Sequence, residues 1–169
     1  MSVNVPEMLD VWRMVAARRS FEGSLSLSGL ERVRDLLFDT EGEVRFALQF
    51  DSDSLLKLPY VELRIDAELP LECQRSLQRF LFPVHMVQRL GLIRDEAGEA
   101  ALPAEYEALL VPEDGMLRAQ DLVEDELVLA IPAVPMNPES DAVEREWPIP
   151  EEELAKVSPF AALGSLKKN

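Results

Sequence analysis

A chain of 169 residues is long enough for one folded domain, or for one domain with a tail. Its hydrophobic content of 47% suits a globular core, and no apolar run approaches the ~20 residues that span a bilayer. The single cysteine excludes an internal disulfide, and charged residues interrupt the N-terminal segment where a signal peptide would be apolar. We therefore expect a cytoplasmic protein.

The net charge of −15 is unevenly distributed along the chain. Residues 1–94 contain 12 Lys/Arg and 14 Asp/Glu, whereas residues 95–169 contain 5 and 18, a net charge of −13. Because Lys and Arg neutralise phosphates in nucleic-acid complexes, the second part should repel bare RNA. It should attract a basic protein. Alternatively, the acidity only keeps the protein soluble.

The N-terminal part predicts two helices separated by a short strand. The first helix covers residues 7–19, with an apolar face of Leu9, Trp12, Val15 and Ala16. Apolar and polar residues alternate over 21–27, as in a strand. A second helix is expected from Ser28, because Glu31 three residues later completes a capping box. Its apolar face consists of Leu30, Val33, Leu36 and Leu37.

Three strands with a two-residue period follow, at 43–50, at 61–69 and at about 77–90. In the third, Phe80, Phe82, Val84 and Met86 share one face, and Arg79, His85 and Arg89 share the other. This period predicts an antiparallel sheet with one buried and one hydrated face.

The rest of the chain predicts a loop or loose helical turn over 94–105, a short strand over 106–111 and a helix over 122–131. Asp121 is the expected N-cap of this helix and Pro132 ends it. We therefore predict an α+β domain over residues 1–132. It would hold an antiparallel sheet of four to six strands that can curl toward a barrel, flanked by the two N-terminal helices and helix 122–131. Residues 133–169 are rich in proline and acids and are expected to form an acidic tail.

The segment 73–94 is the one electropositive stretch of this acidic chain. It contains no acid and five groups that can contact RNA phosphates, namely Arg75, Arg79, His85, Arg89 and Arg94. The alternative is structural, because these side chains can pair with Glu62, Asp66 and Glu68 on a neighbouring strand.

Two further sets of residues are candidates for docking a partner. Glu124, Asp125 and Glu126 form an acidic run on the predicted helix, although such runs are usually a solvated face. The C-terminal segment 158–168 is short and amphipathic, with Phe160, Leu163, Leu166 and Lys167 as its candidate contacts. Alternatively, this segment folds back to cap the chain's own sheet.

Catalytic motifs are missing. The sequence contains no Gly-x-Ser-x-Gly, no glycine-rich phosphate loop and no His-Glu-x-x-His, and its only histidine is His85. We therefore expect no enzymatic activity and no cofactor. A hydrolase or nuclease acting on precursor RNA is the alternative class, and it would require a bound divalent metal.

Three stretches together carry a resemblance to a known family: Leu71-Glu-Cys-Gln-Arg75, Val123–Pro135 and Ser158–Lys168. Their order and the chain length resemble the YceD family of large-ribosomal-RNA accumulation proteins. The resemblance implies a bacterial, cytoplasmic, non-enzymatic ribosome biogenesis factor that supports the accumulation of 23S ribosomal RNA. In many bacteria the family's gene lies beside one for a small basic large-subunit ribosomal protein. The acidic part of the chain would then chaperone such a protein. The alternative is a direct RNA-binding module that uses segment 73–94.

The resemblance also bears on Cys73. Members of the family typically carry Cys-x-x-Cys here, and often further Cys or His after the Pro-x-x-Pro segment, which resembles a zinc site. In this chain the second position is Ser76, and Met136 and Asn137 follow Pro135. We therefore expect no metal, and we expect Cys73 to be a semi-buried thiol that packs as a small hydrophobe.

Overall fold

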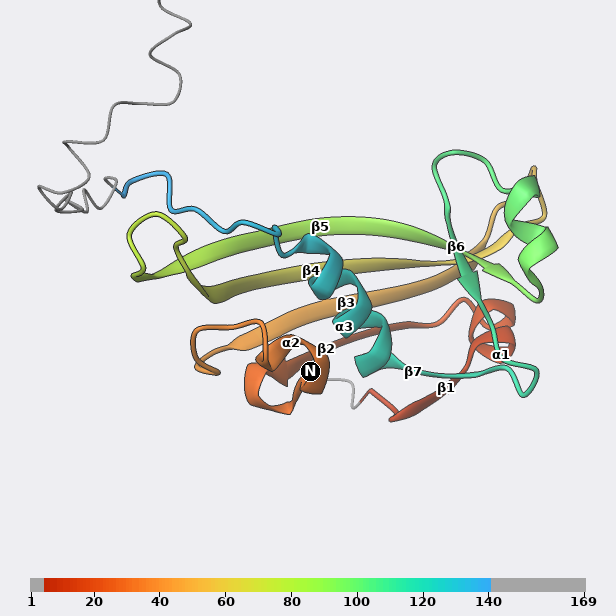
Figure 1. Cartoon of the computed structure of the whole chain (residues 1–169). Helices are drawn as coiled ribbons and strands as arrows, with labels where there is room; N and C mark the ends of the chain where they lie inside the picture. Colours follow the sequence, from red (N-terminus) through yellow and green to blue (C-terminus); the bar gives the residue numbers. More distant parts are fainter. Residues whose placement is uncertain (1–4, 141–169) are drawn as a thin grey trace, which may run out of the picture.

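The computed structural model describes residues 5–140. Its main feature is a five-stranded sheet with the strand order β2-β3-β4-β5-β6 (Figure 1). The strands are β2 (Ser20–Ser26), β3 (Glu43–Ser52), β4 (Pro59–Glu72), β5 (Arg79–Ile93) and β6 (Glu107–Leu110). Neighbours are antiparallel except β5 and β6, which are parallel. The predicted α+β class is confirmed.

A second sheet and three helices complete the described part of the chain. The sheet has two antiparallel strands, β1 (Met8–Asp10) and β7 (Met116–Arg118). The helices are α1 (Val11–Ala16), α2 (Glu31–Arg34) and α3 (Ala119–Ala130). Two 3-10 turns, η1 (Leu27–Gly29) and η2 (Glu96–Ala101), lie between strands. None of the helices in residues 5–140 is long and apolar enough to cross a membrane.

The two-residue period of the strands decides which face of the sheet is buried. Along β4, Val61, Leu63 and Ile65 are at most 1% exposed, whereas Arg64 and Asp66, on either side of Ile65, are exposed. The register places buried residues side by side, for example Leu48 of β3 opposite Leu63 of β4. One face of the sheet therefore forms the core and the other meets solvent, as the sequence predicts.

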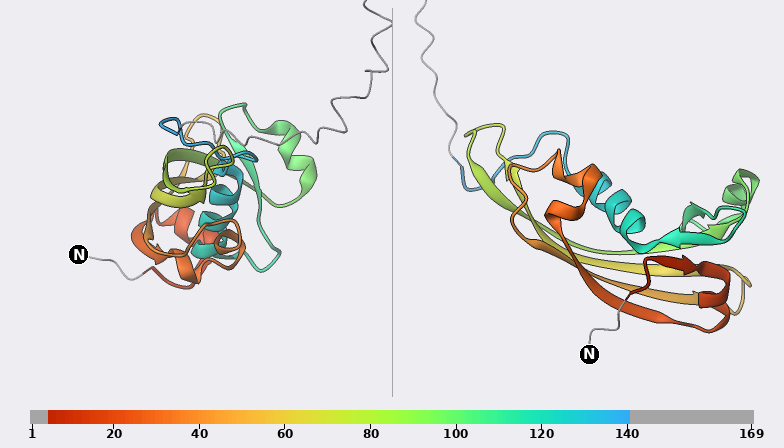
Figure 2. Two further views of the ribbon diagram at one scale, coloured as in Figure 1. Left: turned by 60° about the vertical axis from the view of Figure 1, so that its left-hand side comes forward. Right: turned by 90° about the horizontal axis from the view of Figure 1, so that it is seen from below.

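The helices lie on the core face of a curved sheet, and the rest of the described chain leaves the opposite face bare (Figure 2). Helix α3 supplies Leu122, Val123 and Leu127 to the core, and each is at most 4% exposed. Val33 of α2 and Val11 of α1 are fully buried in the same cluster. Helix-on-sheet packing buries this face without closure into a barrel.

Several predicted elements differ from the structure. The sheet is open, because the core face of β2–β5 is covered by helices and the edge strand β6 is short. The helix predicted over 7–19 covers only Val11–Ala16, because Met8–Asp10 pairs with β7 instead. Asp10 then caps α1 by accepting from the N–H of Arg13.

The second predicted helix is reduced to η1 and the single turn of α2. The capping box expected from Ser28 and Glu31 does not form, because the Ser28 hydroxyl is hydrogen-bonded to the hydroxyl of Ser26. Leu36 lies beyond the helix and is 48% exposed. Helix α3 begins at Ala119, so Asp121 lies inside the first turn and is not the N-cap.

Candidate functional site

The bare face of the sheet carries part of the basic segment predicted to contact RNA. Arg89 Nε lies 3.1 Å from a Glu62 carboxylate oxygen, and His85 Nδ1 lies 2.7 Å from Asp66 Oδ1. Both pairs join β5 to β4 directly across the ladder. A hydrogen bond from Arg64, and to a smaller extent one from Arg89, lowers the pKa of Glu62, so this carboxylate stays charged. The structural alternative, cross-strand pairing, is confirmed for Arg89 and His85.

The other three residues of this set lie at the two ends of β5 and beyond. Arg79 Nε is 2.5 Å from Asp39 Oδ2, and Arg75 is in the turn before the strand, where it donates to the carbonyl of Ser140. The Arg94 guanidinium lies 4.1 Å from the ring centroid of Trp12. At about 3.3 Å per residue, Arg79 and Arg94 are separated by roughly 50 Å of strand. The five groups therefore do not form one basic cluster, and their contact with RNA stays a prediction.

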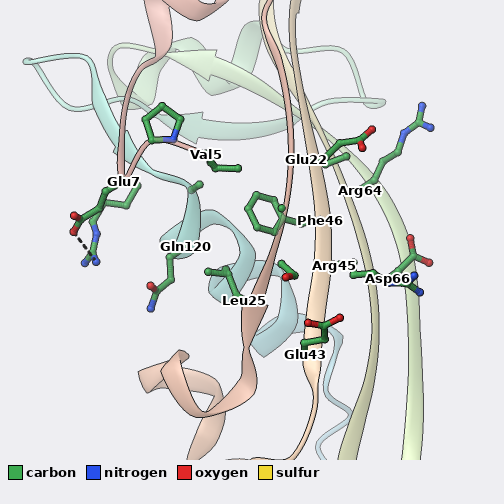
Figure 3. Close-up of a pocket in the computed structure, with 16 residues that line it drawn as sticks. Val5, Glu7, Glu22, Leu25, Glu43, Arg45, Phe46, Arg64, Asp66 and Gln120 are labelled. Carbon is green, nitrogen blue, oxygen red and sulfur yellow. Dashed lines mark hydrogen bonds and ion pairs between the residues drawn. The ribbon is translucent and has the colours of Figure 1, made fainter. Parts of the chain in front are cut away.

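An open groove of about 930 Å³ lies at the β2 edge of the sheet (Figure 3). Val5 and Phe46 line it on one side of β2, while Glu22 and Arg64 lie on the other. Gly23 allows the close approach, because a Cβ there would meet Val5 at 3.0 Å and Phe46 at 3.1 Å. Acidic and basic side chains alternate around this groove, so it favours neither anions nor cations.

The acidic run of α3 divides into three different environments. Glu124 is only 3% exposed and accepts bonds from the Arg32 N–H at 2.9 Å and from Gln120 Nε2 at 2.7 Å. Asp125 is half-exposed and forms an ion pair with the Arg32 guanidinium. Glu126 is 7% exposed and lies between α3 and β6. The predicted solvated face is therefore wrong for Glu124 and Glu126, because α3 packs these two positions against α2 and the sheet edge.

Cys73 lies in the turn between β4 and β5, which has a backbone hydrogen bond and a residue of positive φ at the same positions as the turn between β3 and β4. Asp53 N–H donates to the Leu58 carbonyl at 2.9 Å, and Cys73 N–H donates to the Gln78 carbonyl at 2.9 Å. Asp53 Oδ1 accepts from backbone N–H groups inside its turn, and Cys73 Sγ accepts from the N–H of Ser76 at 3.5 Å. The sulfur thus takes the place of a carboxylate oxygen.

Residues after the Pro-x-x-Pro segment return to this turn. Cys73 Sγ lies 3.3 Å from the Ser140 hydroxyl and accepts from the Asn137 N–H at 3.3 Å. The thiol is fully buried rather than semi-buried. Contacts with the hydroxyls of Ser140 and Ser76 lower its pKa to about 6.

The residues around Cys73 do not fit the zinc site that the family resemblance implies. Its neighbours supply hydroxyl groups and backbone amides where zinc requires thiolates or imidazoles. Within residues 5–140, no group of three or more His, Cys, Asp or Glu side chains is placed to hold a metal ion.

We expect the Cys73 thiol to titrate at a much lower pH than an ordinary thiol. Thiolate absorbance at 240 nm should rise with a midpoint about pH 6, and Ser140→Ala should shift that midpoint upward. Because the folded pKa lies below the ordinary 9.0, the unfolded state holds the extra proton between these values. The contribution of Cys73 to the free energy of unfolding should therefore increase as the pH rises from about 6 to 9. Acidification through the same interval should remove this contribution. A midpoint near pH 9, or the same signal in Cys73→Ala, would contradict this.

The docking residues predicted from the sequence, Phe160, Leu163, Leu166 and Lys167, lie outside the described residues. The sequence pattern did not predict the groove that contains Glu126, because Glu107 of β6 reaches that groove only through tertiary packing. The raised pKa of Glu126 is the physical mark of that environment.

These features define a small acidic α+β protein built on an open, curved sheet. A family model described as large ribosomal RNA subunit accumulation protein YceD matches residues 61–167. The chain belongs to this family. A protein of that name from Haemophilus influenzae (strain ATCC 51907 / DSM 11121 / KW20 / Rd) is 29% identical over 171 residues, covering 98% of this chain and 98% of the relative. No solved structure matches.

Proposed function

We propose that this protein supports the accumulation of large-subunit ribosomal RNA as a cytoplasmic, non-enzymatic ribosome biogenesis factor. Its family membership carries the proposal, since the match to the YceD protein of Haemophilus influenzae extends over 98% of both chains. We further propose that it supports 23S RNA indirectly, by holding a basic large-subunit ribosomal protein until that protein is delivered.

The distribution of charge supports a basic partner. Between Asp95 and Ser140 the chain has 12 acidic side chains and one basic side chain, Arg118. Arg118 is itself within reach of Glu7 and Asp121, at 3.5 and 3.9 Å. This surface attracts cationic proteins and repels phosphates. Direct RNA binding by Arg79, His85 or Arg89 would first have to compete with their intramolecular carboxylate partners.

Deletion of the gene tests the proposed function. We expect the ratio of large- to small-subunit ribosomal RNA to fall in cells that lack this protein and to recover on complementation. In a separate experiment at low salt, the purified protein should form a one-to-one complex with a basic large-subunit ribosomal protein. An unchanged RNA ratio would overturn the cellular role. RNA binding by the pure protein that weakens steeply with salt and with Arg79→Glu would favour the direct RNA-binding alternative.

A further inference from the structure

A second groove, of about 300 Å³, lies between α3 and the β5–β6 edge of the sheet. Leu109, Val128 and Leu129 contribute apolar walls, and Leu129 is 75% exposed. Glu107, Asp125 and Glu126 bring carboxylates into the same small space. Of the described residues that line the groove, Arg32 alone is cationic, and it is paired with Asp125. Among residues 5–140, therefore, no cation lies in the groove beside the carboxylates of Glu107 and Glu126.

Glu126 is the unusual member of this group. It is 7% exposed, and within residues 5–140 it makes no hydrogen bond and no ion pair. Every side-chain oxygen or nitrogen in this range that is sealed from solvent has a partner, so the carboxylate of Glu126 must open onto the groove. Burial, followed by the negative charges of Glu107 and Asp125, raises its pKa. A nearly buried carboxylate beside two others is electrostatically unfavourable unless a cation joins it.

The groove adjoins an open strand edge. Strand β6 pairs with β5 only from Leu90 to Ile93, so the earlier part of β5 has no strand on this side within the described residues. Pro83 lies in that part, where its missing N–H is tolerated because no strand among residues 5–140 pairs with this edge. An extended polypeptide can follow such an edge and place alternate side chains into the groove.

We propose that this groove binds an extended basic segment of a partner protein, with a lysine or arginine side chain held between Glu126 and Glu107. The apolar walls receive the aliphatic stem of that side chain, and the two carboxylates receive its charged end. That the partner is a ribosomal protein rests on the proposed function. The basic character of the segment rests on the groove itself.

The test compares charge-removing variants of the full chain that have the same net charge. The probes are the purified basic proteins of the large ribosomal subunit and a fluorescent ten-residue peptide of alternating lysine and valine. Glu126→Gln and Glu107→Gln should each weaken binding about tenfold or more, since each removes one charge-assisted bond. The matched control, Glu113→Gln, removes an exposed acid outside the groove and should change affinity less than about twofold.

Stability separates a binding role from a structural one. Glu126→Gln should leave the free energy of unfolding unchanged or higher, because it removes a repelled carboxylate that nothing compensates. In the wild type the folded state holds the extra proton between the unfolded and the raised folded pKa, so stability should fall as pH rises through that interval. The variant should lack this slope. A destabilised Glu126→Gln chain would overturn the assignment.

The two proposals fail in different ways. If wild type binds a ribosomal protein and Glu126→Gln binds it equally well, the groove is excluded and the proposed function stands. If the peptide binds in a Glu126-dependent manner but no ribosomal protein binds, the proposed basic-segment groove is supported and the proposed ribosomal partner is overturned. A photo-crosslinker at Leu129 that reacts only with the same chain would show that the groove is covered internally, which overturns the proposal.

Discussion

The triple replacement of Ser76, Asn137 and Ser140 by cysteine is expected to create a zinc site around Cys73. These positions supply the spacing Cys-x-x-Cys twice, as in structural zinc sites. Cys73 Sγ is 3.3 Å from the Ser140 hydroxyl, while sulfurs in a tetrahedral site with Zn–S bonds of about 2.3 Å are about 3.8 Å apart. The sulfurs at positions 73 and 140 would therefore need to separate by only about half an ångström more than the present pair of atoms.

Zinc binding should stabilise the triple variant strongly, because the site would join the β4–β5 turn to the segment after Pro135. Zinc at roughly 1,000 times its Kd should raise the free energy of unfolding by about 4 kcal/mol. Thermal denaturation with and without zinc measures this under reducing conditions, and metal analysis should give one zinc per chain. The matched control adds Cys73→Ser to the triple variant and should retain much less zinc. No retained zinc in the triple variant would mean that the two loops do not converge as described. The wild-type chain should respond to neither zinc nor EDTA.

Glu124→Ala is expected to be the most damaging change in the acidic run. The carboxylate of Glu124 is buried and satisfies the N–H of Arg32 at the first turn of α2, where the chain supplies no side-chain cap of its own. Removal of this carboxylate leaves the partly buried N–H of Arg32 without an acceptor. The free energy of unfolding should therefore fall by about 1–3 kcal/mol. Chemical denaturation at pH 7 measures this loss.

Two neighbouring substitutions control for charge. Glu124→Gln keeps an oxygen that can accept from Arg32 and should lose less than Glu124→Ala. Asp125→Asn removes a partly exposed ion pair with Arg32 and should cost at most about 1 kcal/mol. Equal losses in Glu124→Ala and Asp125→Asn would show that charge, rather than the buried hydrogen bond, sets the contribution of Glu124.

The strands β3, β4 and β5 follow from local sequence because burial on one face imposes a period of two along each strand. Val61, Leu63 and Ile65 are apolar for this reason, and the two-residue period over 61–69 puts them on one face. The core positions of α3, Leu122, Val123 and Leu127, follow from helical periodicity in the same way. The start of α3 differs from the prediction. Asp121 is a favourable N-cap residue by type, but Arg118 occupies the N-cap because the helix begins directly after strand β7.

The polar contacts required the tertiary structure. The bond between Glu124 and the Arg32 N–H joins residues 92 positions apart, and the contact between Cys73 and Ser140 joins residues 67 positions apart. No local pattern distinguishes Glu124, which caps a helix, from Asp125, which forms a half-exposed ion pair with Arg32, or from Glu126, which has no such partner among the described residues. Periodicity determined which residues form the core, because burial repeats with the backbone. The partner of each charged side chain was decided only by the packing of α3 against α2 and the sheet edge, because that packing sets which carboxylates leave water.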